Sequence, residues 1–355
     1  MPSQEEPMRL SYSTLELLNL CERKLQLEKL LTAGETREES FHLSFGTAYG
    51  VGVQTYLETQ DPELSLFKAW LAYYPVLEFG NKTVASCLLA LRSSFPKLDD
   101  LLEDYELVYV EGKPACELSF RLNVNPSYYF VGYIDAVLRN RYTKKHYIFE
   151  CKTTGLTIQD LSPLYKHSGQ ALGYSITLDK IVGKELSSYG VIYFVAQLQR
   201  EFGQSTIHIL PFEKTLMDRL NWFIVLGLDV KHLQEMEALQ VFPRRGSSCL
   251  NFNKPCRHFG TCHLHSLDTP KAYEPDVTEY QFTYELDDLV ADHIERVKNH
   301  VEPEPEPIAG ATLLSTTSVH QVAPSSKPPS IQELLAKRKG AASSNSKLGD
   351  THVLC

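Results

Sequence analysis

The sequence contains no apolar run that approaches the roughly 20 residues needed to cross a bilayer. Its first ten residues, MPSQEEPMRL, lack the apolar stretch of a secretion signal. We therefore expect no membrane association and no secretion, but an intracellular protein, either cytoplasmic or, in a eukaryote, nuclear or organellar. In such a compartment the eight cysteines point to metal binding or buried thiols more than to disulfides.

The sequence also lacks a long basic run, and its net charge is −9. Between Glu274 and Glu306 there are 11 acidic and 2 basic residues, a net charge of −9, so the rest of the chain is close to neutral. That distribution leaves room for a local basic groove. The length of 355 residues and the 43% hydrophobic content are typical of a globular protein with a large core.

Hydrophobic periodicity divides the chain into helical and extended segments. Helices are predicted over residues 11–31, 44–59, 63–74, 81–93, 162–180 and 212–240. Strands are predicted over residues 104–110, 115–124, 128–138, 146–153, 187–197 and 205–212. Ser13 and Glu16 have the spacing of a capping box at the first helix. The order of elements predicts an α/β fold with a central mixed β-sheet flanked by helices and an N-terminal helical region.

Composition changes near residue 271. The stretches EPEPEP, VAPSSKPPS and AASSNSK indicate that residues 271–355 form an acidic, Pro/Ser-rich and mostly disordered tail. Residues 1–270 are then expected to form one domain. Within the tail, SIQELLAKRKG (residues 330–340) has a capping box and is either a solvated segment or a helix that binds a protein partner.

Two neighbouring runs, Tyr128–Leu138 and His146–Thr153, alternate and are rich in β-branched and aromatic residues. Each is typical of a strand, and the polar stretch Arg139–Lys145 between them is typical of a turn. The two runs therefore predict an antiparallel hairpin with its turn centred near Tyr142–Thr143.

This hairpin carries three charged residues in unusual surroundings. Simple antiparallel register places Asp135 opposite Glu150, and Lys152 shares a face with Glu150 because side chains alternate along a strand. Two carboxylates can bind a hard divalent cation, and an amine beside them suits phosphodiester hydrolysis. A structural ion-pair cluster would use the same residue types.

A second pair of polar residues follows on the helix predicted over residues 162–180. Gln170 and Tyr174 are four residues apart and lie on one helical face. Glutamine can hydrogen-bond bases or phosphates, and tyrosine can stack on bases or bind a phosphate oxygen. On its own the pair is weak evidence, because a half-buried amphipathic helix is the default explanation.

Taken in order, GYID ending at Asp135, ECKTT starting at Glu150 and QALGY starting at Gln170 resemble the motifs of the PD-(D/E)XK nucleases. The RecB-like exonuclease branch is the most similar, because it adds the Q-x-x-x-Y motif, and Glu117 matches a glutamate often found on its preceding strand. The resemblance spans about residues 11–266 and implies a restriction-endonuclease-like core.

The resemblance also implies a role for each matched position. Asp135 and Glu150, helped by the Cys151 carbonyl, would bind Mg²⁺ or Mn²⁺, which would lower the pKa of a bound water. Lys152 would orient that water and stabilise developing charge. Gln170 and Tyr174 would hold the DNA strand near the metal.

One position departs from the family pattern. Many RecB-like enzymes carry a G-x-x-x-H motif whose histidine is a further metal ligand, whereas the corresponding stretch here runs from Gly46 to Gly50. Gln54 or Glu58, later on the same predicted helix, are the alternatives for approaching the metal. The change predicts one ligand fewer, a different metal preference or weak activity.

Three cysteines lie close together in the segment SSCLNFNKPCRHFGTCH. Cys249, Cys256 and Cys262 stand among Pro, Gly and Asn residues, which is typical of a metal-binding loop. A remote cysteine on an N-terminal helix resembles the arrangement of AddB-type iron–sulfur nucleases. That resemblance implies a 4Fe–4S cluster held by these three cysteines and Cys21, which would staple the first helix to the end of the domain. Zinc is the alternative ion.

Other residues near this loop or elsewhere in the chain have weaker assignments. His258, His263 and His265 would be surface or DNA-facing residues, or one would replace a cysteine at zinc, and nearby basic side chains suit phosphate contacts or plain solvation. Cys87 and Cys116 are expected in the core, and Cys355 in the tail.

These observations predict a metal-dependent DNA nuclease, most simply an exonuclease, acting in DNA recombination, repair or phage DNA processing. Two alternatives remain open at this point. One is a DNA-binding module of the same fold without activity, which the glycine at position 50 supports. The other is a zinc-stabilised interaction protein.

Overall fold

The computed structural model describes residues 7–31, 41–74, 78, 80–251, 254–264 and 278–299. The chain divides after His300 into two units, and all described residues belong to the first. The helices of this unit are α1 (Tyr12–Leu20), α2 (Glu22–Leu25), a π-helical turn (Gln26–Leu30), α3 (Phe41–Thr59), α4 (Pro62–Ala72), α5 (Val84–Asp104), α6 (Ile158–Lys166), α7 (Gly169–Tyr174), α8 (Ile176–Val182), α9 (Leu216–Leu239), a 3₁₀ turn (Gly246–Ser248) and α10 (Leu286–Asn299).

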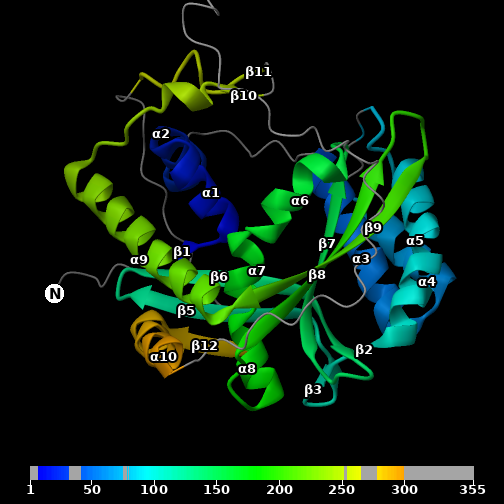
Figure 1. The fold of residues 1–355 in the computed structure, drawn as a ribbon. Helices are drawn as coiled ribbons and strands as arrows, with labels where there is room; N and C mark the ends of the chain where they lie inside the picture. Colours follow the sequence, from blue (N-terminus) through cyan, green and yellow to red (C-terminus); the bar gives the residue numbers. More distant parts are fainter. Residues whose placement is uncertain are drawn as a thin grey trace, which may run out of the picture. The chain divides into compact units, whose positions relative to one another are not determined.

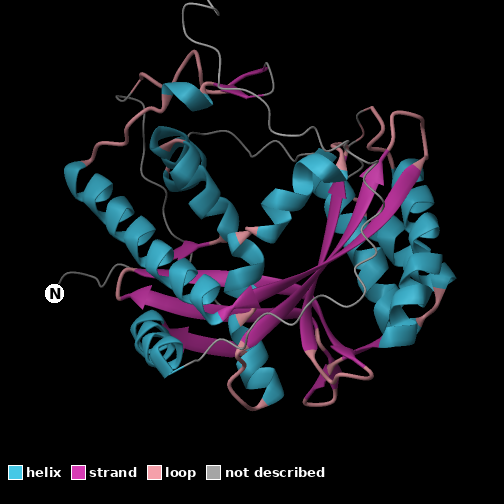
Figure 2. Ribbon diagram, in the orientation of Figure 1, coloured by secondary structure: helices cyan, strands magenta, loops and turns pink. Residues whose placement is uncertain are grey.

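The strands are β1 (Met8–Leu10), β2 (Tyr105–Leu107), β3 (Tyr109–Val110), β4 (Lys113–Pro114), β5 (Cys116–Asn125), β6 (Tyr128–Asn140), β7 (His146–Thr154), β8 (Ser188–Leu198), β9 (Ser205–Thr215), β10 (Leu250–Asn251), β11 (Lys254–Pro255) and β12 (Phe282–Glu285). The central sheet has the order β12-β5-β6-β7-β8-β9, and β1 and β2 also pair with β6. Parallel pairs (β7 with β8, β12 with β5) occur beside antiparallel ones. The predicted α/β class with a mixed sheet is confirmed (Figure 1, Figure 2).

Two hydrophobic cores lie on the two faces of the sheet. One packs α1, α7 and α9 against the sheet, and the other packs α3 and α5, as Figure 1 shows. Strand β8 contributes alternate residues to both cores, Val191 and Tyr193 to the first and Ile192 and Phe194 to the second. A strand buried on both faces reads as a continuous apolar run, which is why this strand was visible in the sequence.

The structure breaks two of the predicted helices. Residues 162–180 are divided among α6, α7 and α8, with breaks next to Ser168 and Ser175. The first predicted helix, residues 11–31, is interrupted at Cys21, whose backbone is extended with φ of −167°. The predicted capping box is wrong, because α1 begins two residues earlier than the box requires, with Ser11 instead of Ser13 at its N-cap.

Part of the predicted tail belongs to the first unit. β12 pairs parallel with β5, Phe282 lying opposite Phe120, and α10 packs against α9. Arg296 of α10 donates hydrogen bonds to Asp179 and to the Leu186 carbonyl oxygen. The unit therefore extends to residue 300 rather than 270. The 330–340 segment and Cys355 lie outside the described residues.

None of the helices in the described part of the chain has the length and apolar character needed to cross a membrane.

Candidate active site

The β6–β7 hairpin has the predicted register. Ala136 pairs with Phe149 and Arg139 with His146, and the same register continued by one residue places Asp135 opposite Glu150. The backbone pairing stops before that last position. There the carboxylate of Asp135 accepts a hydrogen bond from the backbone N–H of Cys151 at 2.7 Å. This side-chain contact takes the place of the backbone pairing between the two strands.

A continuous chain of hydrogen bonds joins the two predicted motifs. The Lys152 ammonium donates to Glu150 Oε1 at 2.6 Å and to Gln170 Oε1 at 2.9 Å. The Gln170 amide then donates to the Tyr174 hydroxyl at 2.9 Å. Strand β7 and helix α7, separated by α6 in the sequence, thus place four of the predicted residues in one network.

The acidic groups of this network have perturbed proton affinities. Burial, and then the neighbouring Glu150, raise the pKa of Asp135 well above its usual value. Burial likewise raises the pKa of Glu150, against the opposing charge of Lys152. For Lys152, burial opposes the charged form, but Glu150 and Asp135 outweigh it and raise the pKa. Closely spaced carboxylates with raised pKa values are typical of a site that binds a cation.

Glu117 lies beside Asp135 on the neighbouring strand. The pairs Cys116–Ala136 and Leu118–Ile134 bracket it, so register places Glu117 opposite Asp135. Its φ of 50° lies in the left-handed region, which is strained for a residue other than glycine. Gln54 of α3 donates a hydrogen bond of 2.6 Å to the Glu117 carboxylate.

This strained backbone coincides with a break in side-chain alternation. Leu118 and Ile134 belong to one core, whereas Cys116 and Ala136, two residues away along each strand, pack in the other. Residues two apart normally share a face of a sheet. Glu117 and Asp135 lie at this irregularity, where the side chains of β5 and β6 switch from one face of the sheet to the other. The alternation of residue types in the sequence does not reveal this switch.

The donor atoms suit a hard divalent cation. Glu150 is 2% exposed, and its Oε2 is buried with no hydrogen-bond partner among the described residues. Buried carboxylate oxygens without a partner are costly unless a cation or donor reaches them. In the same part of the chain, no three His, Cys, Asp or Glu side chains converge closely enough to hold a metal by themselves. The oxygen set of Asp135 and Glu150 therefore fits Mg²⁺ or Mn²⁺ as part of a shell.

Helix α3 presents one face to this region. Gly46 lies 4.0 Å, measured from an ideal Cβ, from the Thr153 hydroxyl on β7, and Gln54 contacts Glu117 on β5. Gly50 lies between them on the same face, and an ideal Cβ there has no heavy atom of the described residues within 4 Å. The position where the resemblance to RecB-like enzymes led us to expect a histidine thus borders open space among the described residues. Glu58, the other alternative ligand, lies near the Cys116 thiol.

All four predicted cluster cysteines line one small cavity of about 20 Å³. Cys21 follows α1, and Cys249, Cys256 and Cys262 come from the segment after α9. All four are free thiols. The four cysteines that we expected to share a ligand therefore line the same cavity. Among the described residues, however, no three of these thiols are arranged closely enough to hold a metal ion.

Ion pairs and backbone contacts attach the cysteine segment to the N-terminal helices. Buried Glu22 pairs with Arg245, and Arg23 donates hydrogen bonds to the carbonyl oxygens of Cys262 and Leu264. Arg257 and His258 also pair with Glu28, at 3.1 Å and 3.3 Å. His258 therefore faces α2 and its extension, His263 is exposed, and His265 lies outside the described residues.

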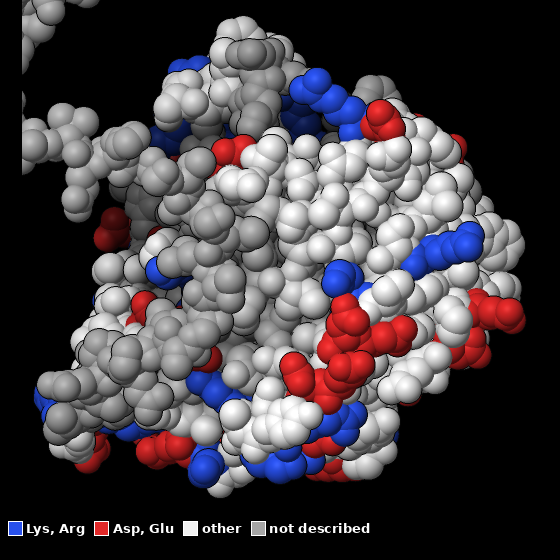
Figure 3. Space-filling view, turned by 45° about the vertical axis from the view of Figure 1, so that its right-hand side comes forward, with Lys and Arg blue, Asp and Glu red and all other residues white. Residues whose placement is uncertain are grey.

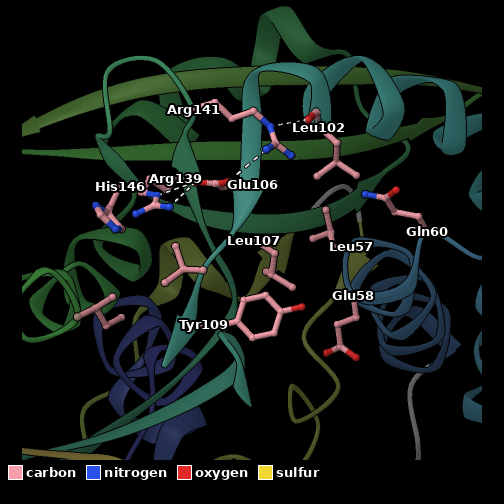
Figure 4. Close-up of a pocket in the computed structure, with 12 residues that line it drawn as sticks. Leu57, Glu58, Gln60, Leu102, Glu106, Leu107, Tyr109, Arg139, Arg141 and His146 are labelled. Carbon is pink, nitrogen blue, oxygen red and sulfur yellow. Dashed lines mark hydrogen bonds and ion pairs between the residues drawn. The ribbon is translucent and has the colours of Figure 1, made fainter. Parts of the chain in front are cut away.

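A different pocket, of about 550 Å³, lies between the ends of α3 and α5 and the strands β2 and β6 (Figure 4). Its two arginines, Arg139 and Arg141, both point to Glu106 and pair with it. The charges of these three side chains neutralise one another in part, so their presence in the pocket is explained by ion pairing within the protein. On the face shown in Figure 3, positive and negative side chains are interspersed beside a broad uncharged area rather than gathered by sign.

The chain belongs to the PD-(D/E)XK nuclease superfamily, whose family model matches residues 9–308. The match covers both the hydrogen-bonded network of Glu150, Lys152, Gln170 and Tyr174 and the cysteine segment. It also includes β12 and α10, in agreement with the domain boundary near residue 300.

Among solved structures, the fold is similar to the crystal structure of a "Putative exonuclease" from Eubacterium rectale. The TM-score is 0.42 at 12% sequence identity, and the alignment covers 78% of this chain and 94% of that one. A comparison with curated proteins gives no match.

Proposed function

We propose that this member of the nuclease superfamily is a Mg²⁺- or Mn²⁺-dependent deoxyribonuclease that hydrolyses phosphodiester bonds from DNA ends. The observation that carries the proposal is the buried Glu150, with one oxygen bound to Lys152 and the other without a partner, next to Asp135. DNA recombination, repair or phage DNA processing are the processes that such an exonuclease would serve.

Each residue of the network has a task in this proposal. Asp135 and Glu150, with the Cys151 carbonyl, would hold the ion, which when bound supplies Lewis-acid polarisation of the phosphate and a more acidic water. Lys152 orients the attacking water and stabilises negative charge on the phosphate. Its position is fixed from two sides, by Glu150 and by Gln170. Gln170 and Tyr174 hold the DNA backbone against this centre.

The test uses end-labelled linear DNA and circular DNA, each with Mg²⁺, Mn²⁺ or EDTA. We expect degradation of linear DNA with either metal and none with EDTA. Glu150→Ala and Lys152→Ala should both abolish it, with Lys144→Ala in the exposed hairpin turn as the control. Cleavage that persists in both site variants would refute the site assignment, and cleavage of circular DNA would refute end dependence.

A second candidate function is a DNA-binding module of the same fold without activity. Gly50 favours it, because the open space beside this residue stands where relatives place a ligand. DNA binding without cleavage across Mg²⁺, Mn²⁺, Co²⁺ and Ca²⁺ would support this candidate over the nuclease.

We further propose that Cys21, Cys249, Cys256 and Cys262 hold a 4Fe–4S cluster, with zinc as the alternative ion. Four thiols around one cavity are the donor set that either one requires. The cluster would be structural and would join α1 and α2 to the segment after α9. Brown protein with iron and sulfide after anaerobic purification supports the cluster, whereas colourless protein with one zinc supports the alternative.

A further inference from the structure

A cavity of about 870 Å³ opens beside the catalytic network. Lys152, Gln170 and Tyr174 line part of it, and residues of β1, β6, β8 and α6 and the start of α1 line other parts. A cavity of this size falls within the range of about 300–1,000 Å³ that encloses small ligands. It can therefore take a short, flexible piece of nucleic acid more readily than a rigid duplex.

Aromatic rings cover much of the wall. Tyr165 stacks on Tyr193, with ring centroids 4.7 Å apart and planes at 23°. Tyr193 is fully buried, whereas Tyr165 is half-buried and lines the cavity, so the stack ends at Tyr165. Tyr133 of β6, 37% exposed, lines the same cavity. Such rings are platforms for unpaired bases, which a duplex keeps stacked on one another.

One end of the cavity suits a phosphate group. The start of α1 faces it, and the Ser11 side chain makes no hydrogen bond to the backbone of the helix that it precedes. The hydroxyls of Ser11 and Ser13 lie there, 3.1 Å apart. Arg9 reaches the same wall and donates a hydrogen bond of 3.1 Å to the Tyr133 hydroxyl. A helix N-terminus with hydroxyls and a guanidinium attracts an anion.

An independent feature also calls for a polar ligand. The Tyr193 hydroxyl is buried at the cavity wall close to Ser168, but no described residue meets it with normal hydrogen-bond geometry. A buried hydroxyl without a partner is unfavourable, and an oxygen or nitrogen of a bound ligand would satisfy it. Tyr12, the first residue of α1, is among the groups close enough to influence this hydroxyl.

Charge inside the cavity is compatible with DNA. Among the described residues that line it, Arg9 and Lys152 carry a permanent positive charge, and Glu16 is the carboxylic acid. Glu16 does not cap the helix, as its spacing suggested, but lies near Tyr12 and Lys152. Burial raises its pKa, and the neighbouring Lys152 ammonium acts in the opposite direction.

We infer that this cavity binds a short stretch of single-stranded DNA, with a base stacked on Tyr165 and a backbone phosphate between Arg9 and the start of α1. The strand would pass Lys152 and so enter the catalytic centre unpaired. The inference rests on the proposed nuclease function and adds that the enzyme acts on a single strand.

Binding can be measured apart from cleavage by fluorescence anisotropy in EDTA. The probes are a labelled oligothymidylate of about 12 nucleotides, within the usual range for single-strand sites, and a blunt duplex of the same length. We expect the single strand to bind at least about tenfold more tightly than the duplex. Equal or tighter binding of the duplex would overturn the inference.

Two variants test the proposed contacts. Tyr165→Ala and Arg9→Ala should each weaken single-strand binding by about five- to tenfold, since one stacked base or one phosphate contact is lost. Tyr165→Phe, which keeps the ring, should bind normally. Tyr142→Ala is the matched control, because this tyrosine is 74% exposed in the β6–β7 turn. Unchanged binding by Tyr165→Ala with normal thermal unfolding would also overturn the inference.

The two proposals fail in different ways. Single-strand binding through Tyr165 without any metal-dependent cleavage supports the binding site and refutes the nuclease function. Cleavage restricted to duplex DNA, with no effect of Tyr165→Ala, supports the nuclease function and refutes the single-strand site.

Discussion

The catalytic network and the cysteine segment are both assembled from distant parts of the chain, but they are held together differently. In the network, the functional side chains bond to each other, from Glu150 through Lys152 and Gln170 to Tyr174. In the cysteine segment, the thiols gather at one cavity, while neighbouring charged side chains make the connections.

This difference indicates where each geometry comes from. The network stands on two central strands and a buried helix, so the sheet fixes its atoms before any ligand arrives. The cysteine segment has two short strands and one 3₁₀ turn as its regular structure in the described residues, so a bound ion or cluster would set its final geometry.

The largest effect should come from breaking the network at its centre. Lys152→Ala removes the hydrogen bonds to Glu150 and Gln170, and we expect DNA cleavage to fall by at least about 10³-fold. Gel-based cleavage of labelled DNA with Mn²⁺ measures this. The Lys152 side chain is 31% exposed, so we expect circular dichroism of the variant to show the native fold. Activity within tenfold of the wild type would contradict the role of Lys152.

The next largest effect concerns the cysteine segment. Cys21→Ser should abolish the iron content and lower the free energy of unfolding by about 5 kcal/mol, or roughly 10–20 °C in Tm. Iron analysis and thermal unfolding of anaerobically purified protein measure both. Cys87→Ala is the control, because that thiol is buried in the other core. Full iron content in Cys21→Ser would rule out this cysteine as a ligand.

Acid should lower the stability of the domain through helix α10, which contributes to neither proposed site. His293 of α10 is 1% exposed, and burial followed by Arg219 lowers its pKa to about 4. Its Nδ1 contacts the Leu289 carbonyl oxygen, so Nδ1 carries the proton and Nε2 faces Arg219. Protonation would set two cations against each other.

The unfolded state takes up this proton near pH 6.5, whereas the folded state does so near pH 4. Stability should therefore fall as the pH drops from about 6.5 to 4, by up to about 3 kcal/mol from this group. Urea unfolding at several pH values measures it, and His293→Asn should show a smaller slope over that range. An identical slope in the variant would exclude His293 as the source.

A gain in metal affinity is expected from a substitution at Gly50, where the resemblance to RecB-like enzymes led us to expect a histidine. Gly50→His adds a ligand type into open space beside the carboxylates, and we expect about tenfold tighter Mn²⁺ binding. Isothermal titration calorimetry measures the affinity. Gly50→Ala separates this from the gain in helix stability, which is about 0.5–1 kcal/mol for alanine and smaller for histidine. Equal affinity in both variants would show that position 50 does not reach the ion.

The smallest effect should come from the pocket outside both sites. Arg141→Ala removes an exposed ion pair with Glu106, while Arg139 keeps the same carboxylate paired. We expect less than about 1 kcal/mol of lost stability and no change in cleavage. A tenfold loss of activity would make this pocket part of the DNA-binding surface.

Much of the catalytic network was predictable from the sequence, because strand alternation and a short turn fix the partner of Asp135 within one hairpin. The local distortion of the backbone near this network was not predictable. The left-handed backbone at Glu117 leaves no mark in the residue types, and Glu16 satisfied a capping pattern while the structure turns it toward Lys152.

The boundary of the domain shows a different limit. Composition assigned residues 282–299 to the tail, because acidic residues are frequent there. Pairing of β12 with β5 is a contact between residues more than 150 positions apart, and no local pattern encodes it. Buried His293 and Leu286 show that a few inward-facing side chains suffice to hold such a segment.

The position of β12 has a consequence for solubility. Strand β5 has β6 on one side and β12 on the other, so β12 covers what would otherwise be an open row of backbone donors and acceptors. Unpaired strand edges invite pairing with other chains. A chain cut at residue 270 would keep every proposed catalytic residue and every proposed cluster cysteine, yet it would expose the edge of β5 and be prone to aggregate.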